Sequence, residues 1–393
     1  MRRLAVLVLV LISAAACAQS QATQGNQLVL GAIYPLTGPQ AEGGKQELAG
    51  VQAALQVSHA NVRLQVIDAT TPQAATAAVD TLVHDYHVPA ILGTYGSTLS
   101  GAASARAEEL KTVYWETGAV ADPITAHRQY VFRTVATGSS LGRMAVTFTH
   151  DVLVPRYRLT VPRAVIVRVS DVYGESVGGG EQALAQSMGI DVVDVIVYNP
   201  NAFDPNVIAA KVASDHPDFL YDVSYLDDGV AIWRSLLDAN VEVKGAIGTS
   251  SAFCMPAFSE RLGAGSVGVY AADKPDGNVA QGALSAGGRS LLAQATAAYG
   301  HPMEIPAVAG FVGGWTLFHD VLPDAGGSVT ASSIRQAAMN VDVPVGDSIN
   351  GGGVKFAGQG APDEGQNTRA AAVVGRWEAV GVMKVVYPAA YAS

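Results

Sequence analysis

The chain has 393 residues, which is long enough for two domains of ordinary size. Hydrophobic residues make up 49% of it and charged residues only 15%, so a mostly disordered chain is excluded. The formal charge is −10, from 34 acidic and 24 basic residues. No run of lysine or arginine offers the positive surface that phosphate backbones require, so nucleic acid is not expected as a partner.

The first residues predict export. Two arginines precede an apolar run and a stretch of small residues, which is the pattern of a signal peptide over residues 1–16. Cys17 follows three alanines and resembles the lipobox cysteine of bacterial lipoproteins, which implies a lipid on Cys17 as the contact with the membrane. The alternative is an ordinary A-x-A cleavage site beside an unmodified cysteine. Residues 17–27 are polar and predict a tether.

Strands and helices alternate from residue 28. Short β-type runs are separated by stretches with apolar residues at helical spacing. The predicted strands are 28–33, 62–67, 88–92 and 112–115, and the predicted helices lie around 48–55, 72–83 and 102–110. This alternation predicts an α/β fold with a parallel sheet that is covered on both faces.

The same alternation begins again after residue 141. The predicted strands are 164–169, 192–197, 219–223, 245–248 and 268–271, with helices at 180–188, 207–214 and 226–239. Two further helices, 283–299 and 311–322, come before strand character returns from residue 354. The repeated order of elements predicts a second α/β lobe that resembles the first.

Ligands of open α/β sheets bind beyond the carboxyl ends of the strands. The loops at those positions read PLTGPQAEGG, GTYGSTLSG, ETGAVAD, SDVYGES, SYLDDG and GTSSAF. Their glycines let backbone N–H groups approach an anion at a helix start, their hydroxyls add hydrogen-bond donors, and their tyrosines provide flat apolar walls. We therefore expect these loops to form the binding site.

Four stretches resemble the branched-chain amino acid binding family, the periplasmic solute-binding proteins of ABC importers. They are GAIYPLTGPQAEGGKQELAGVQAAL at 31–55, VPAILGTYGSTLSGAAS at 88–104, SDVYGES at 170–176 and DFLYDVSYLDDG at 218–229. The resemblance implies two Rossmann-like lobes joined by a three-segment hinge, the type I periplasmic binding protein fold. It also implies a monomer that works with the permease and ATPase of an importer.

The resemblance also implies the lobe boundaries. Residues 28–140 with 272–342 would form the first lobe, and residues 141–271 with 343–393 the second. On this assignment the chain returns to the second lobe near Val343, so 353–360 belongs there.

The resemblance further implies which residues contact the ligand. Ser97 and Thr98, with Tyr95 beside them, would hold a carboxylate, because the loop that contains them opens a helix. The next loop would contribute at Gly118 and Val120. The second lobe would add three more residues, Tyr173, Tyr225 and, where the family has an acid that pairs with the ligand ammonium, Ser250.

Serine at this last position bears on the ligand class, because an unpaired buried ammonium costs several kcal/mol. Glu116 and Asp227 lie at strand ends and are the two acids that could replace the missing partner. If neither faces the ligand, we expect an uncharged amide or a carboxylate without an amine. Small amino acids, amides and organic acids therefore all remain as ligand classes.

Two other functions are open from the sequence. The segment GESVG at 174–178 fits the G-x-S-x-G nucleophile elbow and makes Ser176 a candidate hydrolase nucleophile, with His216, His301 or His319 as the histidine of a triad. No H-G-G-G oxyanion segment precedes it. A ligand-sensing domain of the same fold is the other alternative. No metal site and no cofactor are expected, since neither a third metal ligand beside His84 and His87 nor a nucleotide-binding glycine motif is present. The leading prediction is an exported solute-binding protein that catalyses nothing.

Overall fold

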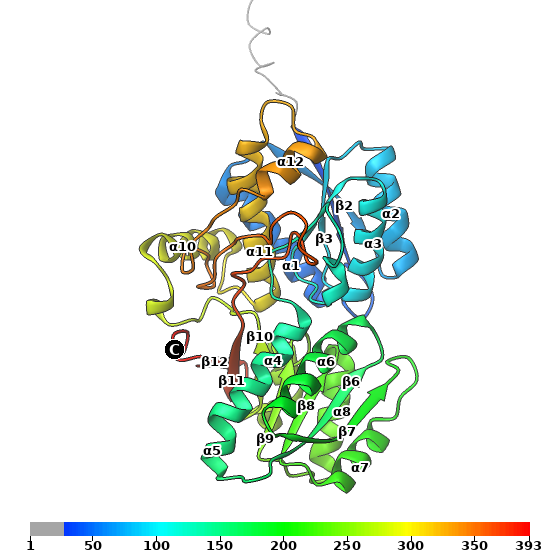
Figure 1. Cartoon of the computed structure of the whole chain (residues 1–393), viewed down its shortest axis with the longest axis vertical. Coiled ribbons are helices and arrows are strands. Elements are labelled where there is room, and N and C mark those ends of the chain that lie inside the picture. Colours follow the sequence, from blue (N-terminus) through cyan, green and yellow to red (C-terminus); the bar gives the residue numbers. More distant parts are fainter. Residues whose placement is uncertain (1–26) are drawn as a thin grey trace, which may run out of the picture.

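The computed structural model describes residues 27–393, which form two lobes stacked along the long axis of the molecule (Figure 1). The predicted signal peptide, Cys17 and nearly all of the predicted tether lie outside the described residues.

The first lobe contains a parallel sheet with the strand order β2-β1-β3-β4-β5. Its strands are β1 (Leu28–Tyr34), β2 (Val62–Asp68), β3 (Ala90–Gly93), β4 (Val113–Glu116) and β5 (Val131–Arg133). One face packs against α2 (Pro72–His84) and α3 (Ser97–Glu109), and the other packs against α1 (Ala41–Ser58) and α11 (Ile305–Trp315). The helices α10 (Ala286–Tyr299) and α12 (Ala331–Ala338) complete this second layer (Figure 1).

The second lobe repeats this arrangement. Its sheet has the order β7-β6-β8-β9-β10, parallel throughout, and then β11 and β12 as antiparallel additions. The strands are β6 (Arg163–Val169), β7 (Asp191–Tyr198), β8 (Phe219–Val223), β9 (Gly245–Thr249), β10 (Tyr270–Asp273), β11 (Val373–Ala379) and β12 (Val382–Tyr387). The helices are α4 (Gly138–Phe148), α5 (Val154–Tyr157), α6 (Val172–Ser187), α7 (Pro205–Asp215), α8 (Leu226–Asp238) and α9 (Pro256–Leu262). The α/β fold class and the second lobe are therefore confirmed.

Three segments join the lobes. The first leads from β5 to α4, the second from β10 to α10, and the third from Asn367 to β11. The prediction that the chain returns to the second lobe near Val343 is wrong, because the third connection begins only at Asn367. Phe356 lies in the first-lobe core, where its ring packs against Trp115 and Phe132 at centroid distances of 5.4 and 5.1 Å. Residues 343–366 therefore belong to the first lobe, and 353–360 contributes isolated bridges instead of a second-lobe strand.

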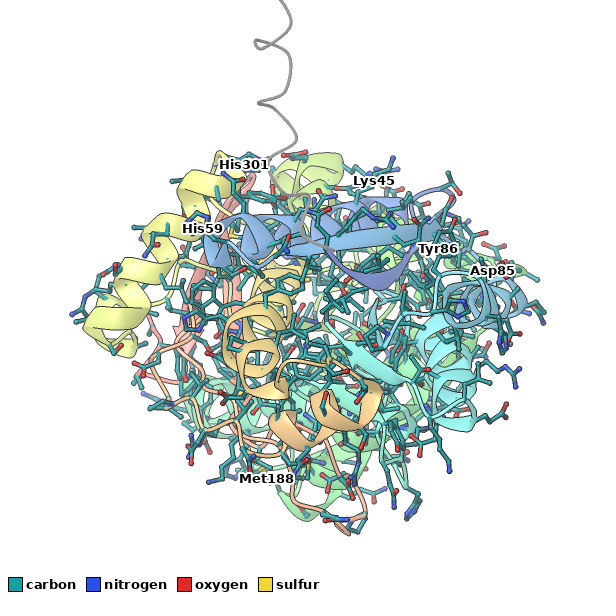
Figure 2. The ribbon with its side chains drawn as sticks, turned by 90° about the horizontal axis from the view of Figure 1, so that it is seen from above. Lys45, His59, Asp85, Tyr86, Met188 and His301 are labelled. Atoms are coloured by element: carbon teal, nitrogen blue, oxygen red, sulfur yellow. The ribbon has the colours of Figure 1, made fainter. Side chains whose placement is uncertain are left out.

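One helical stretch in the described part of the chain, Ile305–Ala325, has the length and apolar composition that a membrane crossing would need. However, 78% of its most apolar window is buried inside the protein, where α11 packs against α1. It is the central helix of the first-lobe core. Polar side chains of the same lobe extend outward in the view from above, among them Lys45, His59 and Asp85 (Figure 2).

Candidate functional site

The carboxyl ends of the two parallel sheets face each other across the boundary between the lobes. A cavity of about 20 Å³ lies there, bordered by both lobes. Its lining is Tyr95, Ser97, Gly118, Ala119, Val120, Tyr173, Tyr225, Ser250, Ser251 and Lys274. Seven of the ten residues that the sequence predicts as ligand contacts are in this list. The structure thus brings together residues that are far apart in the chain, and their binding role remains a prediction.

The lobes touch directly around this cavity. The Tyr95 hydroxyl of the first lobe lies 3.0 Å from the Ser251 hydroxyl of the second lobe. On the outer side, Thr98 donates a hydrogen bond to Asp171 Oδ2 at 3.3 Å. Tyr225 donates to the same carboxylate oxygen at 2.9 Å. A volume of 20 Å³ holds about one water molecule, so a larger solute enters only when the lobes separate.

The start of α3 provides the hydrogen-bond donors of the first lobe. Gly96 precedes the helix, and Ser97, which borders the cavity, is its first residue, so N–H groups without helical partners lie at this border. Ser97 is buried, and its hydroxyl oxygen accepts a hydrogen bond from the Ala121 N–H at 3.2 Å. Its hydroxyl hydrogen is therefore directed away from that N–H, and it can donate to an anion.

Tyrosines form the apolar wall on the second-lobe side. Tyr173 is fully buried and donates a short hydrogen bond to the Thr249 carbonyl oxygen, and its ring lies 5.2 Å from the ring of Tyr225. Burial raises the pKa of both hydroxyls, so they remain neutral donors at physiological pH.

Glu116 and Asp227, the two acids predicted as substitute ammonium partners, do not border the cavity. The fully buried Glu116 accepts hydrogen bonds from the N–H groups of Gly118 and Ala119, both at 2.7 Å, and so shapes the loop that carries them. Burial raises its pKa to about 7. Asp227 lies at the surface and pairs with Arg261 at 2.6 Å.

Three charged residues at the inner end of the cavity were not predicted from the sequence. Lys274 follows β10, and its Nζ lies 3.0 Å from Asp273 Oδ1. A second small cavity beside it is lined by both residues and by Glu47 of α1. Glu47 is fully buried, and its Oε2 has no hydrogen-bond partner among residues 27–393. Burial, reinforced by the nearby Glu116, raises the pKa of Glu47 to about 8.

A signal for Lys274 was present in the sequence. Lys274 lies just after the predicted strand 268–271, which is the fifth strand of its lobe, and the carboxyl ends of such strands are where ligand contacts occur. Glu47 had no comparable signal, because it lies in the middle of a helix whose other buried residues form ordinary core contacts.

An outer groove continues from the cavity toward solvent. It has a volume of about 680 Å³ and is lined by both lobes, with Thr98, Asp171, Tyr225 and Asp227 among its residues. Tyr225 borders both the groove and the cavity. The groove has the size of a typical small-molecule site, so the space between the lobes includes room for a solute beside the inner cavity.

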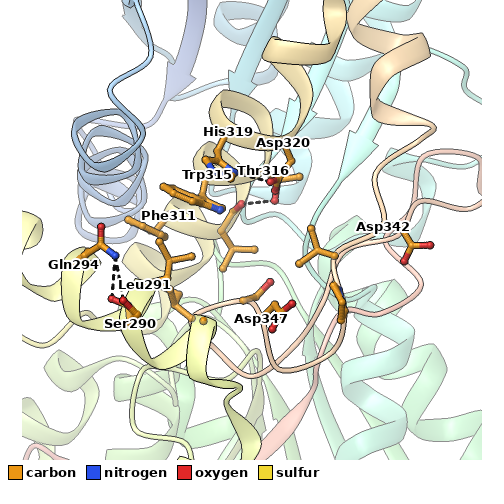
Figure 3. A pocket seen from close by; sticks show the side chains of 16 residues that line it. Ser290, Leu291, Gln294, Phe311, Trp315, Thr316, His319, Asp320, Asp342 and Asp347 are labelled. Carbon is orange, nitrogen blue, oxygen red and sulfur yellow. Dashed lines mark hydrogen bonds and ion pairs between the residues drawn. The ribbon is translucent and has the colours of Figure 1, made fainter.

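A separate hollow of about 460 Å³ lies in the first lobe between α10, α11 and residues 342–349 (Figure 3). Trp315 stacks between Phe311 and His319 along its wall, and Asp320 lies beside them. All of its lining residues belong to the first lobe. A solute held there contacts one lobe only, so it gives no differential stabilisation of a closed form.

The sequence of the chain matches the family model described as "Periplasmic binding protein" over residues 27–378. The chain belongs to the periplasmic binding protein family. A curated relative, Leu/Ile/Val-binding protein homolog 8 of Brucella abortus, is 28% identical over 371 residues, which cover 91% of this chain and 90% of the relative.

Solved structures share the fold of this periplasmic binding protein. A leucine-binding protein from Thermotoga maritima has a TM-score of 0.79 at 18% identity, with 91% of this chain and 97% of that chain covered. A solute-binding protein of an ABC transporter from R. palustris, solved in complex with benzoate, has a TM-score of 0.74 at 19% identity, with 93% and 98% covered.

The hydrolase alternative for this binding protein is wrong. The segment 174–178 lies inside α6 and does not form a strand-to-helix elbow. The Ser176 hydroxyl donates to the Val172 carbonyl oxygen at 2.8 Å and accepts from the Asp122 N–H at 3.0 Å. Within residues 27–393 no hydrogen bond joins it to a histidine, and no group of three or more potential metal ligands occurs in that range.

Proposed function

We propose that this periplasmic binding protein captures a small solute between its two lobes and delivers it to the permease of an ABC importer. The observation that carries the proposal is the convergence of loops from both lobes on one cavity, with hydrogen bonds across the boundary. A solute that contacts both lobes stabilises the closed form, and the closed form is the state that a permease distinguishes from the free protein.

The relatives support a small carboxylate-bearing solute. One similar structure is named a leucine-binding protein, and another was solved with benzoate. Both molecules carry a carboxylate, but only leucine carries an amine. In this chain the α3 start and Ser97 provide the donors that a carboxylate needs. We therefore propose that the carboxylate lies against Ser97 and Thr98.

A thermal-shift screen tests the capture function. The secreted chain from residue 18 would be heated with amino acids, short amides, and aliphatic and aromatic acids. A ligand that binds only the native state raises the melting temperature in a concentration-dependent way. At a ligand concentration of a hundred times Kd, it increases the free energy of unfolding by about 2.7 kcal/mol. Tyr225→Ala should abolish the shift, whereas Tyr86→Ala, at an exposed tyrosine of the first lobe, should retain it. No shift with any solute would contradict the proposal.

The attachment and the assembly state are also proposals. We propose that Cys17 carries a lipid that anchors the protein outside the cytoplasm, and that the folded body is a monomer. Incorporation of a labelled fatty acid that Cys17→Ser abolishes would support the anchor, and incorporation that persists would contradict it. Sedimentation of the chain from residue 18 at a mass above one copy would contradict the monomer.

A further inference from the structure

The hollow of the first lobe has two walls of different origin. On one side, α11 and the residues that continue it, 316–321, carry the stacked rings of Phe311, Trp315 and His319 (Figure 3). The loop 342–349 forms the facing side. The volume of about 460 Å³ is that of a small-molecule site, and the lining comes from one lobe. The capture of a solute between the lobes therefore leaves this hollow unused.

The charge of the lining is negative. Three carboxylates border the hollow, those of Asp320, Asp342 and Asp347, and within residues 27–393 no lysine or arginine borders it. The carboxylate of Asp342 is compensated, because it pairs with Lys355 at 2.9 Å and also with Arg369. The negative charge that remains comes from the other two carboxylates.

Asp320 and Asp347 have no lysine or arginine partner among the described residues. Oδ1 of Asp320 lies 2.7 Å from Nδ1 of His319, and its Oδ2 is buried without a hydrogen-bond partner within residues 27–393. Asp347 is half-buried on the facing loop, and in the same range its side chain forms no hydrogen bond or ion pair. Carboxylates that are partly shielded from water and have no counter-charge attract a cation.

The space between these carboxylates is largely apolar. Leu291, Val312 and Ile349 are buried residues that line it. The Nε1–H of Trp315 has no acceptor within residues 27–393, whereas the other three tryptophans each donate theirs to a backbone carbonyl oxygen at 2.8 Å. A fully hydrated metal ion gains nothing from apolar walls, but an ammonium group on an apolar body matches both the charge and the walls.

From this combination we infer that the hollow is a second ligand site, which binds a small organic cation with an ammonium group on an apolar body. The ammonium pairs with Asp347, the more accessible carboxylate, and the charge of Asp320 adds to the attraction. The apolar body packs against Leu291, Val312 and Ile349. This site goes beyond the proposed capture function and does not depend on it, because the residues that line it belong to the first lobe.

Ligands that share a body and differ in charge test the inference. Isothermal titration of the chain from residue 18 would compare three cations, phenethylammonium, hexylammonium and cyclohexylammonium, each with the neutral alcohol of the same body. At least one cation should bind about tenfold more tightly than its alcohol, because only the cation gains from the unpaired carboxylates. The inference is overturned if none of the three cations binds, or if every alcohol binds as tightly as its cation.

A charge-removing variant assigns the effect to the loop carboxylate. Asp347→Asn keeps the shape of a side chain that bonds to nothing in residues 27–393, so the protein should fold as the parent does. It should weaken cation binding by about tenfold and leave binding of the alcohol unchanged. The matched control is Asp85→Asn, at an exposed aspartate of the first lobe outside the hollow, and it should bind the cation as the parent does. Equal cation affinity in these two variants would overturn the role of Asp347.

Trp315 reports whether the cation lies in this hollow. The other three tryptophans are buried and hydrogen-bonded, so a fluorescence change on cation binding should come from Trp315 and disappear in Trp315→Phe, where titration still detects binding. Tyr225→Ala, at the cavity between the lobes, should retain cation binding. A fluorescence change that persists in Trp315→Phe, or cation binding that is lost in Tyr225→Ala, would overturn the second site. A thermal screen in which no solute stabilises the protein would count against the capture function alone.

Discussion

Asn367 is the residue whose substitution should most disturb the hinge. It is 4% exposed and lies where the third connecting segment leaves the first lobe. Its side-chain amide donates to the carbonyl oxygens of Thr134, in the first connecting segment, and Gly353, at 2.8 and 2.9 Å. Its side-chain oxygen accepts from the N–H groups of Lys355 and Arg369, at 3.0 and 2.9 Å. One side chain thus ties two of the three connections together.

Asn367→Ala removes these four hydrogen bonds and leaves four backbone groups without their partner. At about 1 kcal/mol for each hydrogen bond, the loss of unfolding free energy is about 4 kcal/mol. Urea denaturation followed by circular dichroism measures it. The control is Asn278→Ala, because Asn278 is exposed and bonds only to Asp276 in a surface turn, so it should lose less than about 0.5 kcal/mol.

A second substitution separates the donors from the acceptor. Asn367→Asp keeps the oxygen that accepts from Lys355 and Arg369 but places a carboxylate against two carbonyl oxygens. It should therefore be as destabilising as alanine at neutral pH and partly recover when the carboxylate is protonated at low pH. A loss below about 1 kcal/mol for Asn367→Ala would refute the view that this side chain holds the connecting segments.

The remaining predictions concern binding, pH and packing. Ser97→Ala combined with Thr98→Ala should weaken the binding of a carboxylate solute by at least tenfold in isothermal titration, and unchanged affinity would contradict the assigned carboxylate position. Glu181 is fully buried and burial raises its pKa to about 8, so the native state binds this proton more tightly than the unfolded state and stability falls as pH rises from 4.5 to 8. Glu181→Gln should therefore gain roughly 4 kcal/mol over the parent above pH 8 and little at pH 4.5, while exposed Glu175→Gln in the same helix should show no such trend in urea titrations at each pH. A Cβ on Gly43 would lie 2.3 Å from Cζ of Tyr95, so Gly43→Ala should displace that ring and weaken ligand binding. The control is Gly101→Ala in α3, which has open space around it and should increase the free energy of unfolding by about 0.5–1 kcal/mol. Equal effects of the two substitutions on the melting curve would contradict the packing of Gly43 against Tyr95.

The position of the binding loops was predictable because parallel strands fix it. The carboxyl ends of such strands meet at one edge of each sheet. The loops with Ser97 and Gly118 therefore had to lie together in the first lobe, and the loops with Tyr173 and Ser250 in the second, once the alternation of strands and helices was recognised. Their direct contacts were not predictable. That Tyr95 reaches Ser251 depends on how two lobes dock, and no local pattern encodes the distance between lobes.

The errors have related causes. Val354 and Phe356 alternate with polar residues as an edge strand does, and this period is the same whichever lobe the segment joins, so only the packing of Phe356 on Trp115 decides. The elbow motif around Ser176 failed because five residues match by chance in a chain with 42 glycines, whereas the required strand-to-helix turn is a property of the fold.

The central claim is that two lobes close over one solute, and a distance measured across the outer groove tests it most directly. Spin labels at Pro39→Cys in the first lobe and Asn201→Cys in the second would flank that groove, and the free, buried Cys254 would be changed to alanine so that only these two sites carry a label. Pulsed electron resonance would give the distance distribution without solute and with the solute that shifts the melting temperature most. Closure predicts a long, broad distribution that becomes short and narrow on binding, and a distribution that saturating solute leaves unchanged would contradict the claim.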